Sequence, residues 1–189
     1  MSQADAAVQR AAQALASGAL VILPTETVYG LAADAADPRA VAALFEAKGR
    51  PQFNPLIAHV ADLAMGETIA RFDDRARALA KAFWPGPLTL VLPVADTAAV
   101  CDLARAGLDS VAVRAPAHPV AHAVIAALGR PVVAPSANRS GRPSPTTFSD
   151  ALEETGVFAL AALDGGPCAV GLESTVVALL DEPRLLRPG

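Results

Sequence analysis

Short apolar runs alternate along the chain with longer segments in which apolar positions recur at helical spacing. Asp37 and Pro38 illustrate how a helix begins, because Asp is a favoured N-cap and Pro suits the first helical position. The pattern predicts helices at residues 4–17, 38–48, 73–83, 119–128 and 146–154. It predicts strands at 20–23, 56–60, 88–92, 111–114 and 132–134, and around 158–163, 174–179 and 184–187. This alternation predicts one α/β domain over residues 1–189, with an open, twisted, mixed sheet flanked by helices and no second domain.

The two common phosphate-binding signatures are missing from this sequence. No GxGxxG follows the first predicted strand, and no GxxxxGK[ST] occurs anywhere. A standard Rossmann or P-loop interpretation is therefore excluded. Any nucleotide must be held by other polar loops, and the loops that follow the strands are the candidates.

Composition narrows the class of protein. Hydrophobic residues make up 53% of the 189 residues, yet much of this is Ala, and no apolar run approaches the roughly 20 residues that span a bilayer. The N-terminus lacks the basic start and apolar block of a secretory signal, so a soluble, cytoplasmic protein is expected. A net charge of −4 argues against a protein whose main task is to coat nucleic acid. The isolated Cys101 and Cys168 and the few histidines predict no protein-held metal site, although Mg²⁺ can arrive with a nucleotide.

The segment PVVAPSANRSGRPSPT, residues 131–146, is the most informative. An apolar strand breaks abruptly into hydroxyl, amide and guanidinium groups, which can donate hydrogen bonds to an anionic, oxygen-rich ligand at the end of the strand. The alternative is an ordinary surface loop whose polar side chains satisfy the backbone of its turns.

Two cations open the segment KGRPQFNPLIAHV, residues 48–60. Lys48 supplies a compact charge and Arg50 a planar fork, a combination that suits a polyphosphate. Alternatively, both simply stabilise the end of a helix through its dipole. His59 is interpreted as a ligand contact, and the other interpretation is a core histidine with its hydrogen bonds satisfied.

Three further segments place polar residues at strand ends. PTETVYG, residues 24–30, follows the first strand and offers hydroxyl groups, or else a capping arrangement at the start of a short helix. Arg114 ends the strand of DSVAVRAPAHP, where it can bind a carboxylate or phosphate, or form a structural ion pair. GLESTVV, residues 171–177, opens a β-branched strand, and Arg187 near the end of the sequence is either a ligand contact or solvated.

Together, PTETVYGLAADA, KGRPQFNPLIAHV, FWPGPLTLVLP, DSVAVRAPAHP, PSANRSGRPSPT, GLESTVV and LLRPG resemble the YrdC/TsaC family of threonylcarbamoyl-AMP synthases. The resemblance runs from about residue 20 to residue 189. It implies the YrdC-like α/β fold and a nucleotidyltransferase that forms L-threonylcarbamoyladenylate and pyrophosphate from L-threonine, bicarbonate and ATP with Mg²⁺. That product serves the threonylcarbamoyl modification of adenosine 37 in tRNA, together with the proteins that transfer the group to tRNA.

The resemblance also implies residue roles. The amino-acid pocket is assigned to Thr27, His59, Arg114, the backbone at Ala134, and Ser174. The ATP site is assigned to Lys48, Arg50, Asn54, Ser110, Ser136, Asn138, Ser144 and Arg187, of which Lys48 and Arg50 are also the catalytic candidates. No nucleophile-base pair is evident, so positioning and charge stabilisation are expected to carry the reaction.

The ending at Arg187-Pro188-Gly189 departs from relatives that continue, some of them into a linker and a second domain that can cover the site. Substrate sequestration is then expected to use a mobile loop, an open site or partner proteins. The same fold also occurs in hydrogenase-maturation carbamoyltransferases, whose additional segments do not fit in 189 residues. The alternative from another class is a non-catalytic protein that binds double-stranded RNA or tRNA weakly, which the net charge disfavours.

Overall fold

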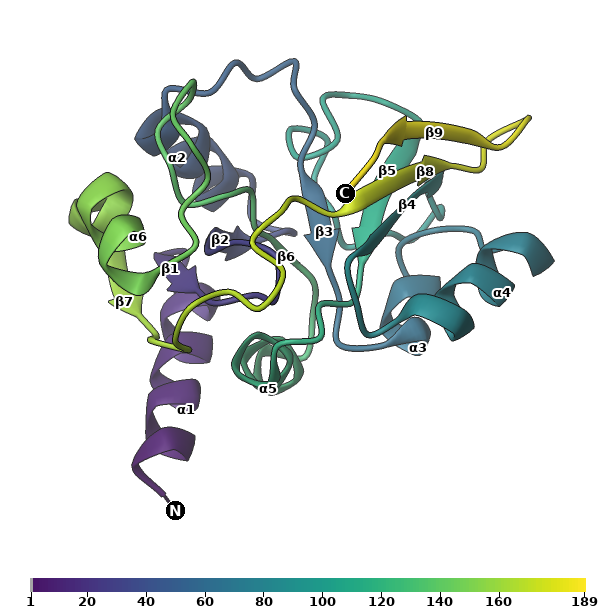
Figure 1. Cartoon of the computed structure of the whole chain (residues 1–189). Coiled ribbons are helices and arrows are strands. Elements are labelled where there is room, and N and C mark those ends of the chain that lie inside the picture. The colour runs from purple at the N-terminus through teal and green to yellow at the C-terminus, as the bar shows by residue number, and fades with distance from the viewer. Residues whose placement is uncertain (1) are drawn as a thin grey trace.

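A computed structural model describes residues 2–189 (Figure 1). Nine strands form one mixed sheet in the order β7-β1-β2-β6-β3-β5-β4-β8-β9. The strands are β1 (Leu20–Leu23), β2 (Gly30–Asp34), β3 (Ile57–His59), β4 (Leu88–Pro93), β5 (Ser110–Arg114), β6 (Val132–Val133), β7 (Ala159–Ala162), β8 (Thr175–Ala178) and β9 (Arg184–Arg187). The helices are α1 (Gln3–Ala16), α2 (Pro38–Lys48), α3 (Leu63–Glu67), α4 (Asp74–Phe83), α5 (Pro119–Leu128) and α6 (Phe148–Thr155), followed by a 3₁₀ turn, η1 (Gly156–Phe158). The predicted open, mixed α/β sheet is confirmed.

Local chemistry explains the helix ends. Asp37 caps α2, its side chain accepting a hydrogen bond from the Arg39 N–H at 2.8 Å, and Pro38 is the first helical residue. Gly49 ends this helix with φ +58°, a left-handed conformation that glycine adopts without steric cost. That reversal directs the chain after α2 toward the loop that carries Arg50.

Two elements were missing from the sequence prediction. β2 has the sequence GLAAD, a run of mostly small residues with no alternation of apolar and polar positions. It becomes a strand by pairing with both β1 and β6. The helix α3 is a single short element, too brief for periodicity, although Asp62 caps it with a 2.8 Å hydrogen bond from the Met65 N–H. The short helix considered near residue 26 is wrong, because residues 24–29 form a loop that leads directly into β2.

Helices cover the two faces of the sheet unequally. One face packs continuously against α2 and α4, through residues such as Leu44 and Ala80. On the other face, α1 and α5 pack together and cover β1, β2 and β6, with Leu15 and Ile125 fully buried beneath them. The side chains of His59 and Arg114 share this second face, since directly paired residues of adjacent strands point the same way. The uncovered part of this face, over β3, β5, β4 and β8, is where the polar strand ends gather.

Within residues 2–189, no helix combines the length and apolar character that a bilayer crossing requires.

Candidate active site

A small cavity of about 30 Å³ opens on the uncovered part of the sheet. All five residues assigned by resemblance to the amino-acid pocket line it, and they come from five separate segments of the chain. The lining consists of Thr25, Thr27, Val28, Ile57, His59, Arg114, Ala134, Pro135, Ser136, Glu173 and Ser174.

Arg114 is the fixed cation of this cavity. Its side chain is only 4% exposed, and Nη2 donates to Glu26 Oε1 at 2.6 Å while Nη1 donates to Thr27 Oγ1 at 2.9 Å. Nε donates to the carbonyl of Gly86 at 3.1 Å. The guanidinium still has two N–H groups beyond these three bonds. Arg114 therefore makes a structural ion pair and also faces the cavity with donors left for a carboxylate.

The loop after β1 holds Thr27 in place. The hydroxyl of Thr25 donates to the carbonyl of Val28 at 2.6 Å and accepts from the backbone N–H groups of Thr27 and Val28, both at 3.2 Å. These local bonds replace a helical cap by a tight turn. Both threonines are buried, so their hydroxyl groups are fixed at the cavity wall.

His59 is neutral, and a hydrogen bond to the backbone of Ile57 orients its imidazole ring. Nδ1 lies 3.1 Å from the carbonyl oxygen of Ile57, and because a carbonyl only accepts, Nδ1 carries the proton and Nε2 the lone pair. Complete burial, followed by the nearby charge of Arg114, lowers the pKa of His59 to about 3. His59 thus offers the cavity an acceptor and no charge.

Ser174 connects the cavity to the end of the chain. Its hydroxyl lies 2.7 Å from the hydroxyl of Thr89 and accepts from Arg187 Nη2 at 3.0 Å. Arg187 Nε also donates to the carbonyl of Ser174 at 3.0 Å. Arg187 is therefore half-buried and bonded, rather than simply solvated, and it links a residue assigned to the amino acid with one assigned to the nucleotide.

Lys48 is buried beneath the loop that follows β6. Its Nζ donates to the carbonyl oxygens of Ser136 and Asn138, which leaves one N–H free. Burial, followed by the positive charge of Arg50, lowers the pKa of Lys48 to about 8. Lys48 therefore orders the loop and remains close to losing its proton at neutral pH.

Arg50 orders its own loop in a similar way. Nε donates to the carbonyl of Asn54 at 3.3 Å and Nη2 to that of Pro55 at 3.2 Å. Burial lowers the pKa of Arg50, an effect that the charge of Glu173 partly opposes. Asn54 itself is exposed.

The loop after β6 is held by its own side chains. Asn138 Nδ2 donates to the carbonyls of Arg139 and Arg142 at 2.9 and 2.7 Å, while its buried Oδ1 has no partner in residues 2–189. Farther along, Ser144 Oγ donates to Glu173 Oε1 at 2.8 Å. The predicted binding loop is thus an ordered turn with one unsatisfied acceptor.

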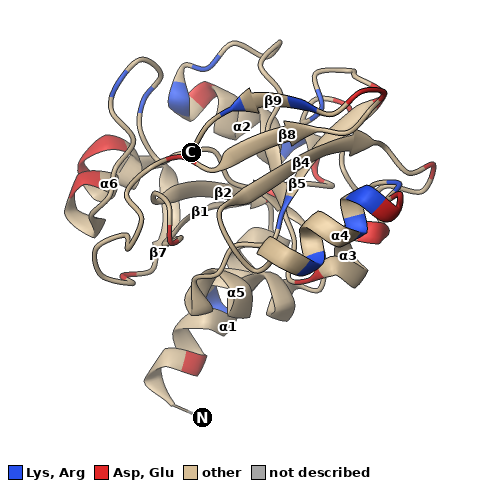
Figure 2. Cartoon of the chain, turned by 45° about the vertical axis from the view of Figure 1, so that its right-hand side comes forward, with Lys and Arg blue, Asp and Glu red and all other residues tan. Residues whose placement is uncertain are grey.

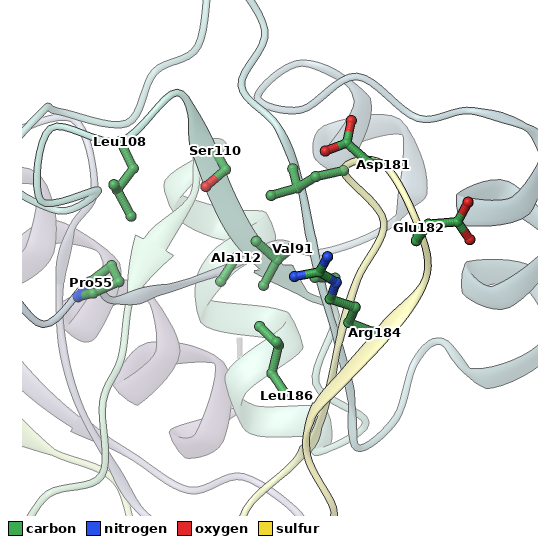
Figure 3. A pocket seen from close by; sticks show the side chains of 11 residues that line it. Pro55, Val91, Leu108, Ser110, Ala112, Asp181, Glu182, Arg184 and Leu186 are labelled. Carbon is green, nitrogen blue, oxygen red and sulfur yellow. The ribbon is translucent and has the colours of Figure 1, made fainter.

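A wider groove continues from the cavity along the same face of the sheet (Figure 3). Ser110, Ala112 and Arg114 alternate along β5 and point to one side, so the first two line the groove and the third lines the cavity. Arg184 and Leu186 of β9 project over the groove from the opposite wall, and Pro55 lies at its edge (Figure 3). The groove is largely apolar, which suits a planar ring system better than a phosphate.

The charged residues that line this groove are Arg184 together with Asp181 and Glu182, which precede β9. Figure 2 shows the basic residues of β9 along the upper edge of the molecule near the C-terminus. Within the part of the chain described, no group of three or more His, Cys, Asp or Glu side chains is placed to hold a metal ion.

Two acidic residues of the candidate site, Glu26 and Glu173, were not among the residues assigned from the sequence. Glu26 orients Arg114 from behind, and its second oxygen accepts from the Ala117 N–H at 3.0 Å. Glu173 lines the cavity next to Ser174. Both lie inside the quoted segments PTETVYG and GLESTVV, so the sequence shows that they stand beside a strand end. It does not show which way their side chains point.

Comparison with protein families gives one match over most of the chain. The model of the Sua5/YciO/YrdC family, described as telomere recombination, matches residues 13–189. A threonylcarbamoyl-AMP synthase of Pyrococcus abyssi is 49% identical over 96% of this chain, and one of Bacillus subtilis is 45% identical over 100% of this chain. The chain spans about half the length of these relatives, 54% and 55% respectively.

A solved structure shares the fold closely. The crystal structure of P. abyssi Sua5 complexed with L-threonine superposes with a TM-score of 0.94 at 48% identity, covering 98% of this chain and 54% of that one.

Proposed function

The chain belongs to the Sua5/YciO/YrdC family, and we propose that it forms L-threonylcarbamoyladenylate and pyrophosphate from L-threonine, bicarbonate and ATP. The observation that carries the proposal is the cavity in which Thr27, His59, Arg114, Ala134 and Ser174 meet. The L-threonine complex of a 48% identical relative supports an amino acid as the ligand of this cavity.

The polar groups of the cavity suit L-threonine. The free N–H groups of Arg114 bind the α-carboxylate, a charge-assisted pairing with planar geometry. The lone pair of His59 Nε2 accepts from the side-chain hydroxyl, which a neutral imidazole can do at any physiological pH. Serine keeps this hydroxyl but lacks the methyl group, so discrimination against serine depends on apolar contact with Val28 and Ile57.

ATP would lie along the groove beside the cavity. Its base occupies the apolar part near Pro55, Ala112 and Leu186, with Ser110 as a polar contact. The phosphates then point toward Lys48 and Arg50, where cations offset their charge. Mg²⁺ arrives with the nucleotide as part of the substrate.

Residues around the triphosphate complete the nucleotide site. Arg187 and Ser144 are donors for phosphate oxygens at the junction of groove and cavity. Asn138 Oδ1 needs a hydrogen-bond donor, which a ribose hydroxyl or a water molecule on Mg²⁺ supplies and a phosphate does not. Ser136 lines the cavity, and Asn54 lies in the exposed loop ordered by Arg50, from which its amide could reach the nucleotide.

The chemistry follows from this placement. The threonine ammonium group first loses a proton, and the resulting amine attacks carbon dioxide or bicarbonate, forming an N–C bond and giving a carbamate. With carbon dioxide the nitrogen releases a second proton, and with bicarbonate a water molecule is released instead. A carbamate oxygen then attacks the α-phosphorus, and the bond from that phosphorus to the bridging oxygen breaks as pyrophosphate leaves. Lys48 and Arg50 stabilise the leaving charge, and no covalent intermediate with the protein forms.

The product's role completes the proposal. Threonylcarbamoyladenylate is passed, through tRNA threonylcarbamoyl-transfer proteins, to adenosine 37 of tRNA. We place this enzyme in the cytoplasm, where such tRNA is modified.

The decisive test is pyrophosphate release from ATP and bicarbonate with L-threonine, with L-serine, and with no amino acid. The proposal expects release that depends on threonine, together with the mass of threonylcarbamoyladenylate. Release independent of the amino acid, or none from folded protein, would contradict it.

A further inference from the structure

Glu173 is a charged residue at the cavity to which the family resemblance gives no role. It lies between the cavity and the nucleotide site, and its side chain is 37% exposed. Its backbone is tightly held, because a Cβ added to Gly189 would lie 2.4 Å from the carbonyl oxygen of Glu173. The C-terminal residue thus packs directly against the backbone from which this carboxylate projects.

The partners of Glu173 belong to the proposed nucleotide site. Oε1 accepts from Ser144 Oγ at 2.8 Å, and Oε2 lies 3.6 Å from Arg187 Nη2. Its negative charge also acts on Lys48 and Arg50, whose pKa values it raises against the lowering effect of burial. A carboxylate thus occupies a region whose other groups suit phosphate.

The charges of the cavity explain why a carboxylate is useful there. Arg114 and Glu173 are the charged side chains that line it, and Arg114 is already paired with Glu26 behind the wall. A bound amino acid is a zwitterion, so a carboxylate on Arg114 leaves an ammonium group that needs a negative partner. His59 offers no charge, which leaves Glu173.

We propose that Glu173 is a further amino-acid-binding residue, whose carboxylate pairs with the ammonium group of the substrate. This inference rests on the proposed function. A triphosphate would compete for the donors of Ser144 and Arg187, and so free the Glu173 oxygens for the ammonium group. Nucleotide is therefore expected to strengthen threonine binding, and Glu173 carries that coupling.

The test compares two ligands that differ at one group. Calorimetry on the full chain measures binding of L-threonine and of 2,3-dihydroxybutanoate with matching configuration, which has a hydroxyl in place of the ammonium group. Both titrations contain a non-hydrolysable ATP analogue. The wild type should prefer threonine by about tenfold or more, the scale of one charge-assisted hydrogen bond. In Glu173→Gln this preference should fall to about onefold, while the ATP analogue binds as tightly as before or more tightly.

Glu154→Gln is the matched control. Glu154 also acts on the pKa of Lys48 and bonds to Arg142 in the neighbouring loop, but it does not line the cavity. Its removal should leave the preference for threonine unchanged. If Glu173→Gln does not fold, Glu173→Asp provides the comparison. Asp keeps the negative charge, but its shorter side chain holds the carboxylate farther from the ligand, so the preference for threonine should fall below tenfold without disappearing.

Three outcomes would overturn the inference. One is a Glu173→Gln variant that keeps the full preference for the ammonium group. Another is an equal loss of affinity for both ligands, which indicates a structural role alone. The third is a wild type that binds threonine without any preference. A wild type that binds no threonine at all would instead contradict the proposed function.

Discussion

Replacing Glu26 by Ala should destabilise the fold more than any surface charge change. The Glu26 and Arg114 side chains are 11% and 4% exposed, so solvent screens their ion pair poorly. The substitution leaves Arg114 buried with its bonds to Thr27 and Gly86 but without a counter-charge, and it removes the acceptor of the Ala117 N–H. Breaking a buried pair from one side costs about 3–5 kcal/mol, and that is the loss expected here.

Equilibrium unfolding in urea, extrapolated to water, measures this loss. Glu67→Ala is the control, since Glu67 pairs with Arg77 at 2.7 Å on the surface, where both side chains are roughly 40% exposed, at 39% and 43%. Its loss should stay within about 1 kcal/mol.

A double-mutant cycle decides whether the loss belongs to the pair. Once Arg114 is also replaced by Ala, no unpaired buried charge remains, so the double variant should be more stable than the sum of the single losses predicts. Additivity within about 0.5 kcal/mol, or a loss below about 1 kcal/mol for Glu26→Ala, would refute the reasoning.

Three further predictions concern single side chains. Since the pKa of Lys48 is about 8, kcat/KM for ATP should fall above that pH as the ammonium loses its proton, and Lys48→Arg should move the fall to higher pH; identical profiles would contradict this. Arg50→Ala should reduce pyrophosphate release by about 100-fold or more, with an unchanged circular dichroism spectrum, because a cation beside the leaving group is lost; near-normal turnover would exclude this role. The folded-state pKa of His59 lies below its unfolded value, so stability should fall as pH drops below about 6.5 by up to about 1.4 kcal/mol per pH unit. Urea unfolding at pH 6.5 and pH 5 should show a smaller fall for His59→Gln, and an equal fall would contradict the buried, neutral state.

The sequence allowed most of the fold to be predicted, because helix starts and stops are local. Asp37, Pro38 and Gly49 mark the limits of α2 by backbone chemistry that needs no tertiary contact. Strand β2 could not be found in this way, because its small residues show no local pattern. It is a strand because it pairs antiparallel with β1 on one side and with β6, about 100 residues later, on the other.

The residues of the candidate site were predictable as types, and their partners were not. Arg114 at a strand end indicated an anion receptor, but nothing local shows that Glu26 points at it from another strand's loop. Likewise, the cations of KGR indicated phosphate, whereas the bonds from Lys48 to the Ser136 and Asn138 carbonyls depend on how two distant loops pack. The roles of these residues in binding remain predictions for the experiments described above.

The parallel pairing of β4 with β8 has a consequence for synthesis of the chain. The hydroxyl groups of Thr89 and Ser174 meet across a separation of 85 residues, so β4 has no partner on that side until the ribosome has delivered β8. During that interval the segment Leu88–Pro93, rich in leucine and valine, is an open strand edge. Such an edge can pair with another unfinished chain, so this interval of biosynthesis exposes the protein to aggregation.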